Sequence, residues 1–426
     1  MALKRSSRVA ILAVLGCVVP MAAQTKTTIF NFPGGGRGGI SVSGLVADKQ
    51  GNLYGTGWGT NIPPTSSVAF KLSWAGGKWI ETVLHVFGTQ QGDGTNPYST
   101  LTFDGKGNMF GTTTEGPNGS CSPVCGTVYE LSPNGVGGYT ETVIYAFPAT
   151  GGTMPIGGVI IDALGNLYGT TSRGGSVECG WTLEFTGCGS VYKLTPGANG
   201  WTFTNLYYFH PTMTRPDGVE PEGTLYEDAQ HNLYGTTAYG GSGNGGTVFE
   251  LTAGKGGGYR DSLLYSFVSP YDVGYQPTSG LIADKQGNLY GTTRSGGSGC
   301  NDLCGTVFEM SPTASGWQEQ TIYNFQGGSD GFGPQYGNLA RDAQGNLYGV
   351  TVEGGNGSCT YGCGTVYELS PVVGGGWSEK VLYTFQGGTD GESPYGSVVV
   401  DAAGDVFGTT AFGGSQGVGT VFEITP

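Results

Sequence analysis

Basic residues and histidines are scarce in this chain, and their scarcity argues against several functions. Its 426 residues include 18 lysines and arginines, 32 aspartates and glutamates and three histidines, with a formal net charge of −14. Such an acidic chain is a poor match for nucleic acid or anionic lipid, which bind basic patches. The charge suits a protein that stays soluble outside the cell, and it leaves room for a bound cation. The histidines, His85, His210 and His231, have no recognisable partner in the sequence.

Long apolar runs are also lacking, apart from one near the N-terminus. Lys4, Arg5 and Arg8 make a basic start, and Val9–Val19 is apolar but too short to span a bilayer. We expect residues 1–23 to be a secretory signal peptide cleaved near Gln24, which places the remainder in an extracellular or periplasmic location. Alternatively, Cys17 ends a loose lipobox and carries a lipid anchor. No later segment is apolar enough to predict a membrane span.

The other eight cysteines are few but regularly placed. They form four local pairs in the same slot of a repeating unit: Cys121 with Cys125, Cys179 with Cys188, Cys300 with Cys304, and Cys359 with Cys363. An even, locally paired set in an exported chain indicates disulfides, and closing so short a loop stabilises by about 2 kcal/mol. A zinc site is the alternative, but structural zinc takes four ligands and each pair supplies two. We therefore expect four disulfides and no metal there.

Helical periodicity is absent after Gln24, and a β repeat takes its place. The phrase Asp-x-x-Gly-Asn-Leu-Tyr-Gly, or a close variant, recurs at spacings of 56 to 66 residues and begins at Asp48, Asp104, Asp162, Asp228, Asp284, Asp342 and Asp401. One unit, residues 279–325, predicts strands over 280–284, 288–293, 305–310 and 317–325. The 84 glycines fall at fixed places in this period, which indicates turns and bulges rather than disorder.

The two ends of the repeat array decide between an open solenoid and a closed ring. Residues 27–32 match the fourth strand of a unit, and residues 419–426 match the third. A ring in which the N-terminal strand completes the last blade explains this split, whereas a solenoid needs two dissimilar caps. The sequence therefore predicts an all-β protein, a seven-bladed β-propeller of four-stranded antiparallel blades over residues 24–426. We expect it to be a monomer.

Aromatic residues recur at two positions of the unit. The first set is Tyr54, Phe110, Tyr168, Tyr234, Tyr290, Tyr348 and Phe407, and the second is Trp79, Tyr139, Trp201, Tyr259, Trp317 and Trp377. Because both faces of a blade pack on neighbours, we interpret both sets as inter-blade core. The glycine after each member of the first set predicts a close backbone approach between blades.

The compound motif of the unit resembles a known family. Asp-x-x-Gly-Asn-Leu-Tyr-Gly-Thr-Thr, a glycine-rich loop, Gly-Thr-Val-Phe-Glu-Leu-Ser-Pro, then Trp-x-Glu-x-x-Leu-Tyr-x-Phe, Gly-Gly-x-Asp-Gly and Pro resemble the GloVer tandem repeat of secreted bacterial "choice-of-anchor" proteins. The resemblance covers nearly all of residues 24–426. It implies export, tandem repeats and often a surface anchor, with no established activity. No C-terminal anchor is recognisable, so attachment to the cell depends on whether Cys17 carries a lipid. The first two strands also resemble NHL-type or kelch-like blades, a likeness of fold alone.

The face of the ring that carries the long loops is the expected binding surface. In a propeller, the loops after the fourth strands and the cysteine-bearing loops share one face. An aspartate recurs in the long loops, usually before glycine: Asp93, Asp217, Asp272, Asp330 and Asp390. A ring of carboxylates suits Ca²⁺, which takes six to eight oxygen ligands, so calcium stays an open alternative to no cofactor. Asp-Gly is also a turn signal that needs no ligand, and its regular placement favours that interpretation.

One pair of loops breaks the regularity and is the best candidate for a site. Glu220 and Glu222 lie beside Asp217, and the span between Cys179 and Cys188 is longer than its counterparts. Aromatic side chains in that span would suit a sugar or a peptide, although a local hydrophobic plug is the alternative; they are Trp181 and Phe185.

Binding is the function that these observations favour. Matches to Gly-x-Ser-x-Gly and Gly-x-Gly-x-x-Gly are expected by chance in so glycine-rich a chain, and none joins a strand to a helix. We expect no catalytic residues and interpret the chain as an exported binding or scaffold module for a glycan or a surface protein. The alternatives are a polysaccharide hydrolase or lyase that uses acids of the long-loop face, and a structural envelope component.

Overall fold

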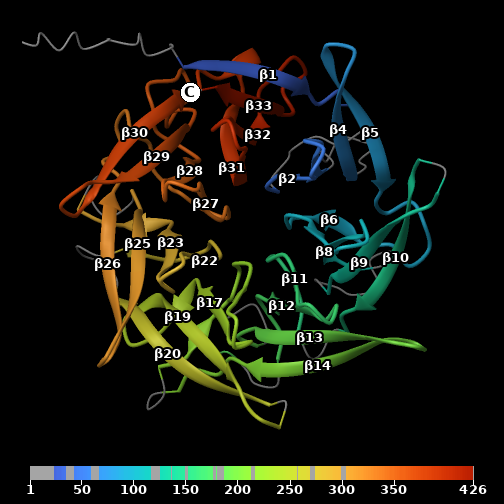
Figure 1. Cartoon of the computed structure of the whole chain (residues 1–426), viewed down its shortest axis with the longest axis vertical. Helices are drawn as coiled ribbons and strands as arrows, with labels where there is room; N and C mark the ends of the chain where they lie inside the picture. Colours follow the sequence, from blue (N-terminus) through green and yellow to red (C-terminus); the bar gives the residue numbers. More distant parts are fainter. Residues whose placement is uncertain are drawn as a thin grey trace, which may run out of the picture.

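The blades stand in a ring around a central axis, and the chain visits them in sequence order (Figure 1). The structure, a computed structural model, describes residues 24–34, 43–58, 67–116, 125–135, 137–148, 152–175, 179, 187–212, 216–256, 258–268, 274–298 and 304–425. Within these ranges, seven antiparallel sheets of four main strands form the ring, which confirms the predicted propeller. No helix among the described residues is long and apolar enough to cross a membrane. Cys17 and the expected signal peptide lie outside the described residues.

The first three blades follow one another from the N-terminal side. Blade 1 consists of β2 (Val46–Ala47), β3 (Leu53–Gly57), β4 (Val68–Ala75) and β5 (Lys78–Val86). Blade 2 consists of β6 (Thr95–Pro97), β7 (Thr102–Phe103), β8 (Met109–Glu115), β9 (Thr127–Pro133) and β10 (Tyr139–Ala146). Blade 3 consists of β11 (Ile160–Ile161), β12 (Leu167–Thr171), β13 (Ser190–Gly197) and β14 (Gly200–Tyr208).

The next three blades continue the ring. Blade 4 consists of β16 (Tyr226–Glu227), β17 (Leu233–Thr237), β19 (Asn244–Ala253) and β20 (Tyr259–Val268), with the small pair β15 (Gly218–Val219) and β18 (Tyr239–Gly240). Blade 5 consists of β22 (Ile282–Ala283), β23 (Leu289–Thr293), β25 (Thr306–Thr313) and β26 (Gly316–Asn324), with β21 (Gly274–Tyr275) and β24 (Ser295–Gly296). Blade 6 consists of β27 (Ala340–Arg341), β28 (Leu347–Thr351), β29 (Thr365–Pro371) and β30 (Trp377–Thr384).

Blade 7 joins the two ends of the chain. It consists of β31 (Glu392–Val400), β32 (Val406–Phe412), β33 (Thr420–Thr425) and the N-terminal β1 (Thr25–Asn31), and the 3₁₀ turn η3 (Gly388–Asp390) precedes it. β1 pairs antiparallel with β33, so that Thr25 lies opposite Thr425 and Phe30 opposite Val421. The predicted closure by the N-terminal strand is therefore confirmed.

The repeated aspartate organises the turn between the first two strands of each blade. Asp284 Oδ1 accepts hydrogen bonds from the backbone N–H groups of Gln286 (2.8 Å) and Asn288 (2.9 Å). Its Oδ2 accepts from Asn288 Nδ2 (2.9 Å) and from the Tyr290 hydroxyl (3.1 Å). One carboxylate thus connects the turn to the returning strand, which explains why aspartate, asparagine and tyrosine recur together.

Aromatic rings fill the spaces between blades, as the sequence predicted. Tyr54 is 3% exposed and Tyr290 is 5% exposed. The second aromatic set supplies the partner from the next blade: Trp377 lies 5.9 Å from Tyr290, and Trp317 lies 5.8 Å from Tyr234, between ring centroids. Edge-to-face geometry of this kind adds to the energy of simple burial.

The glycine after each of these aromatics has a different role from the one predicted. A Cβ atom at Gly55 would lie 2.8 Å from the ring of Phe70, and one at Gly291 would lie 2.6 Å from the ring of Phe308. Phe70 and Phe308 belong to the third strand of the same blade. Glycine therefore makes room for an aromatic ring within the blade, and the expected backbone approach between blades does not occur at these positions.

The first strand of each regular blade is also shorter than predicted. The sequence suggested residues 280–284, whereas β22 covers only Ile282–Ala283. Near the axis the backbone bonds to the neighbouring blade, because the Gly280 N–H donates to Asn338 Oδ1 of blade 6 (2.9 Å). The backbone N–H finds its hydrogen-bond partner in the neighbouring blade and does not need a partner strand, so the strand begins only at Ile282.

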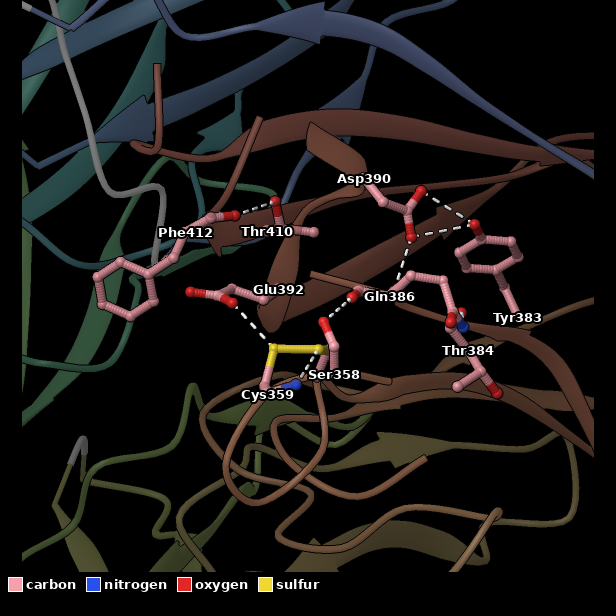
Figure 2. Close-up of a disulfide and its surroundings, with 10 residues drawn as sticks. Ser358, Cys359, Tyr383, Thr384, Gln386, Asp390, Glu392, Thr410 and Phe412 are labelled. Carbon is pink, nitrogen blue, oxygen red and sulfur yellow. Dashed lines mark hydrogen bonds between the residues drawn. A yellow bond between two sulfur atoms is a disulfide. The ribbon is translucent and has the colours of Figure 1, made fainter. Parts of the chain in front are cut away.

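The long loops and the cysteine-bearing loops lie on one face, as predicted. β15, from the long loop, pairs with β18, which follows the second strand of blade 4, and β21 pairs with β24 in the same way in blade 5. Disulfides Cys179–Cys188 and Cys359–Cys363 are present, with Cα atoms 5.1 and 5.2 Å apart (the second in Figure 2). Cys125 and Cys304 are also disulfide-bonded, while Cys121 and Cys300 lie outside the described residues.

Candidate ligand-binding site

In blades 2–5 and 7, the chain enters the blade near the axis through a turn whose residue before a proline has an unusual backbone conformation. The residue before a proline has positive φ in these turns, between 51° and 62°, at Asn96, Met154, Glu220, Gln276 and Ser393. Residues before proline normally adopt extended conformations, and left-handed backbone is unfavourable for residues other than glycine. Hydrogen bonds on both sides hold the turn: Gln276 N donates to Gly245 O (2.7 Å), and Arg294 N donates to Gln276 O (3.0 Å).

In blades 2, 3, 4 and 7 the side chain that follows the proline lines a depression at the axis. Its volume is about 440 Å³. Tyr98, Ile156, Glu222 and Tyr395 come from the turns, and Tyr336 comes from the longer turn of blade 6. The ends of the second strands complete the wall with Trp58, Thr114, Arg173, Ala411 and Phe412. We call this depression the axial mouth; it opens on the long-loop face.

Backbone contacts narrow the channel below the axial mouth. The next space along the axis holds only about 20 Å³ and is lined largely by small residues. A Cβ atom at Gly157 would lie 2.8 Å from Gly223 O, and one at Gly44 would lie 2.6 Å from Ser397 N. The close backbone approach between neighbouring blades therefore occurs at these glycines near the axis, and not at the glycines that follow the first aromatic set. The axial mouth is therefore a cup with a narrow floor.

Aromatic rings form two sides of the cup. Tyr336 and Tyr395 are stacked with centroids 6.1 Å apart, and Trp58 lies 5.4 Å from Tyr98. Burial raises the pKa of Tyr98 and of Tyr395 above the usual range, so both phenols stay neutral hydrogen-bonding groups at physiological pH. Rings with polar edges are suited to stacking against the apolar face of a polar ligand.

The charged side chains in the wall of the cup are Glu222 and Arg173, and Arg294 lies close enough to act on the charge of Glu222. Burial, reinforced by the charge of Glu220, raises the pKa of Glu222 to about 7, and the positive charges of Arg294 and Arg173 oppose this rise. Glu222 therefore exchanges a proton near neutral pH. The Arg294 side chain is exposed, and no described residue forms an ion pair with it. An exposed guanidinium beside aromatic rings is able to bind an anion bidentately.

The structure places the predicted long-loop aspartates within their own loops. Asp330 accepts from the Tyr323 hydroxyl (3.0 Å) and from Gln326 N (2.8 Å). Asp390 accepts in the same way from Tyr383 and Gln386, as Figure 2 shows, and also from Lys26 Nζ (2.8 Å). Asp217 accepts from the Tyr207 hydroxyl (2.7 Å) and His210 N (3.0 Å), and Asp93 accepts from Gly88 N (2.8 Å). Each carboxylate orders a loop, and ligand binding by these aspartates stays a prediction.

Among the other predicted site residues that the structure describes, only Glu220 and Glu222 lie close together. Glu222 lines the axial mouth, and Glu220 is near enough to influence its charge. Asp217 is buried with its carboxylate bonded to Tyr207 and His210 instead. Trp181, Phe185 and Asp272 lie outside the described residues.

Sequence reasoning missed most of the cup, although a signal was present. The residue after the proline differs from unit to unit within an otherwise regular repeat: Tyr98, Ile156, Glu222, Thr278, Gln335 and Tyr395. The residue after the Gly-Thr-Thr phrase varies similarly, and Arg294 occupies that position in blade 5. Positions that vary in a regular array are those that the scaffold does not require. Four of them, Tyr98, Ile156, Glu222 and Tyr395, line the axial mouth.

A second cavity, on the turn face between blades 2 and 3, is a weaker candidate. It holds about 490 Å³ and is lined by Asp104, Asp162, Phe110 and Trp201, among others. These are the repeated residues that build the turns and the inter-blade core. The axial mouth, lined by residues that differ among blades, is therefore the better candidate for specific recognition.

Fold and site together define a propeller of tandem repeats with a variable cup at one end of its axis. Residues 124–359 and 298–426 match the Gloeobacter/Verrucomicrobia repeat, more than half of the chain. The chain belongs to this family. No curated protein matches the sequence significantly.

Solved structures share the fold at low sequence identity. The extracellular domain of BT4673 from B. thetaiotaomicron matches over 93% of this chain at 11% identity, with a TM-score of 0.54. An ancestral GH74 enzyme matches over 91% at 9% identity, with a TM-score of 0.52. This chain spans only 40% and 48% of those two longer chains. The likeness at this identity concerns the propeller architecture alone.

Proposed function

We propose that the chain is an exported binding module whose axial mouth holds a glycan unit bearing a carboxylate. The observation that carries the proposal is Arg294, an exposed cation within electrostatic range of Tyr336 and Tyr395 of the cup, in a chain of net charge −14. Aromatic rings stack on sugar faces, and a guanidinium pairs with a carboxylate. Disulfides support export, because they form in oxidising compartments.

A binding assay with two ligand classes tests this function. Oligouronates and neutral oligosaccharides of the same length are titrated calorimetrically against the chain and against Arg294→Ala. The variant should lose about 10-fold or more in affinity for oligouronates, since a charge-assisted pair contributes about 1.5–3 kcal/mol. Neutral oligosaccharides should be unaffected.

Two further variants make the assay specific. Arg260→Ala removes an exposed arginine from β20 on the outer strand and should leave both affinities unchanged. Tyr395→Ala should weaken both ligand classes, because it removes a stacking surface. Equal affinities of Arg294→Ala and Arg260→Ala for oligouronates would rule out the arginine pairing.

Hydrolysis or elimination is the second candidate, and Glu222 is the observation that favours it. A carboxyl group with a pKa near 7 in an aromatic pocket is protonated often enough at neutral pH to act as a general acid. Turnover should then fall as pH rises above about 7, because the protonated form is the active one. Glu222→Gln should abolish turnover while oligouronate binding survives; turnover that persists in this variant excludes Glu222 as the acid.

A further inference from the structure

A second cluster of functional groups lies between blades 1 and 2, away from the axial mouth. In blades 3 and 5 a tyrosine near the end of the fourth strand contacts both the long-loop aspartate and an acid on the next blade. Tyr323 donates to Asp330 (3.0 Å) and also interacts with Glu379. Tyr207 reaches Asp217 at 2.7 Å and Asp261 at 3.3 Å. A single hydroxyl thus serves two carboxyl groups at these interfaces.

Blade 1 carries a histidine where these tyrosines stand. His85 Nε2 lies 3.0 Å from Asp93 Oδ2, and Glu141 of β10 is the acid from blade 2. Potential ligand atoms of these three residues all lie within 4.8 Å of one another. His85 is 7% exposed and Asp93 is 1% exposed. This partnership was not predictable from the sequence, because Glu141 comes from the next blade and is far from His85 and Asp93 along the chain.

Two oxygens of the cluster are unsatisfied. Asp93 Oδ1 and Glu141 Oε1 are buried and have no hydrogen-bond partner among the described residues. The fully buried Tyr129 hydroxyl also lacks a partner there and lies within electrostatic range of both carboxylates. The Asp93 and Glu141 carboxylates lie side by side with little access to solvent, which is costly unless a cation or a proton neutralises one of them. In blade 7, Lys26 stands at the strand position that Glu141 holds in blade 2. Its ammonium group pairs with Asp390 at 2.8 Å, so a cation neutralises the long-loop aspartate there.

We propose that His85, Asp93 and Glu141 form a site for a divalent transition-metal ion of the zinc class. Three protein ligands, one imidazole nitrogen and two carboxylate oxygens, suit Zn²⁺ with a water molecule in the fourth position. One double positive charge balances both carboxylates. Calcium is a poorer match, because it takes six to eight oxygen ligands and avoids imidazole. Such an ion joins the long loop and the fourth strand of blade 1 to the fourth strand of blade 2.

The repeat supplies matched variants for the test. His85→Tyr introduces the residue found at this position in blades 2–6, beside an aspartate and a glutamate like those around Tyr323 of blade 5, so it should fold and bind no zinc. Tyr323→His does the reverse and recreates the donor set beside Asp330 and Glu379. The chain with its disulfides intact is stripped with EDTA, incubated with ZnCl₂ and gel-filtered, and its zinc is counted by mass spectrometry.

The expected stoichiometry is one zinc in the wild-type chain, none in His85→Tyr and two in Tyr323→His. Zinc at 100-fold its dissociation constant should raise the Tm of the wild-type chain by about 3 °C or more, with no rise in His85→Tyr. Calcium and magnesium should give no such shift. Zinc content that is zero in the folded wild-type chain, or equal in wild type and His85→Tyr, overturns the proposal. Should His85→Tyr fail to fold, Asp93→Asn provides the same comparison.

Discussion

One aspartate per repeat holds the short turn, and its carboxylate makes a different number of hydrogen bonds in different blades. Asp162 accepts from Leu164 N, Asn166 N, Asn166 Nδ2 and the Tyr168 hydroxyl. Among the described residues, Asp401 accepts from Ala403 N and Asp405 N alone. Burial alone would raise the pKa of Asp162, but the hydrogen bonds outweigh burial and lower it. Comparing Asp162 with Asp401 therefore measures how much the additional hydrogen bonds contribute to stability.

Alanine at Asp162 should destabilise the chain more than alanine at Asp401. We expect a loss of about 2 kcal/mol for Asp162→Ala and about half of that for Asp401→Ala, because hydrogen bonds to a charged group are the stronger kind. Because the pKa of Asp162 is lowered by folding, its contribution is present above pH 3.8 and disappears as pH falls through the folded value. Denaturant unfolding at pH 7 and at pH 3 measures the free energy of unfolding of both variants and its pH dependence. Equal losses of this free energy in the two variants at pH 7 would contradict the prediction.

At the scale of the strand, contacts between fourth strands decide how the ring responds to pH. Glu379 of β30 faces Asp330 and Tyr323 of the preceding blade and Tyr367 of its own. Burial, together with the charge of Asp330, raises the pKa of Glu379 to about 7, and the hydrogen bond from Tyr323 works against the rise. The folded chain holds this proton more tightly than the unfolded chain does.

Stability from Glu379 should therefore fall as pH rises from about 4.5 to about 7. The contribution is complete below pH 4.5, the pKa of the unfolded chain, and it is lost as pH rises through the pKa of the folded chain. The pH dependence is opposite to that of Asp162, whose contribution is lost as pH falls. Glu379→Gln keeps the shape without the charge, so it should raise Tm at pH 8 and change it little at pH 5. A Tm difference of the same size at both pH values would mean that the proton is not responsible.

At the scale of the whole molecule, closure depends on a strand that is far away in the sequence. β1 supplies the outer strand of blade 7, and Lys26, with a side chain only 4% exposed, pairs with Asp390 and lies 5.7 Å from the rings of Tyr383 and Phe385. Thr25 lies opposite Thr425, so the two ends meet where other blades have a hairpin. In blade 5, Thr313 and Gly316 close that hairpin.

A circular permutant tests this view of closure. Residues 24–426 are joined end to end through a copy of the turn 313–316, and new termini are placed at the exposed Val373. The permutant should fold with an unchanged circular dichroism spectrum, since every strand keeps its neighbours. Deleting residues 24–34 should instead lower Tm strongly and cause aggregation, because β33 becomes a free edge. A permutant that does not fold while the parent chain does would contradict this account of the ring.

Periodic features were predictable from the sequence, and features that depend on one place in space were not. Repeats at 56 to 66 residues indicated the blades, the split between residues 27–32 and 419–426 indicated the closure, and local cysteine pairs indicated the disulfides. Glu222 was also identified as a site candidate. Tyr98, Tyr336 and Arg294 were not, because they belong to blades 2, 6 and 5 and meet only at the axis.

The sequence by itself determined the local architecture, because each strand, turn and disulfide is built from neighbours within one repeat. Only the tertiary structure decided which side chains share the axial mouth and which face each other between blades. Those contacts join residues up to hundreds of positions apart, as with Lys26 and Asp390, and ring closure alone sets their distances. Short-range pattern therefore encodes the blade, whereas long-range packing creates the cup and the His85, Asp93 and Glu141 cluster.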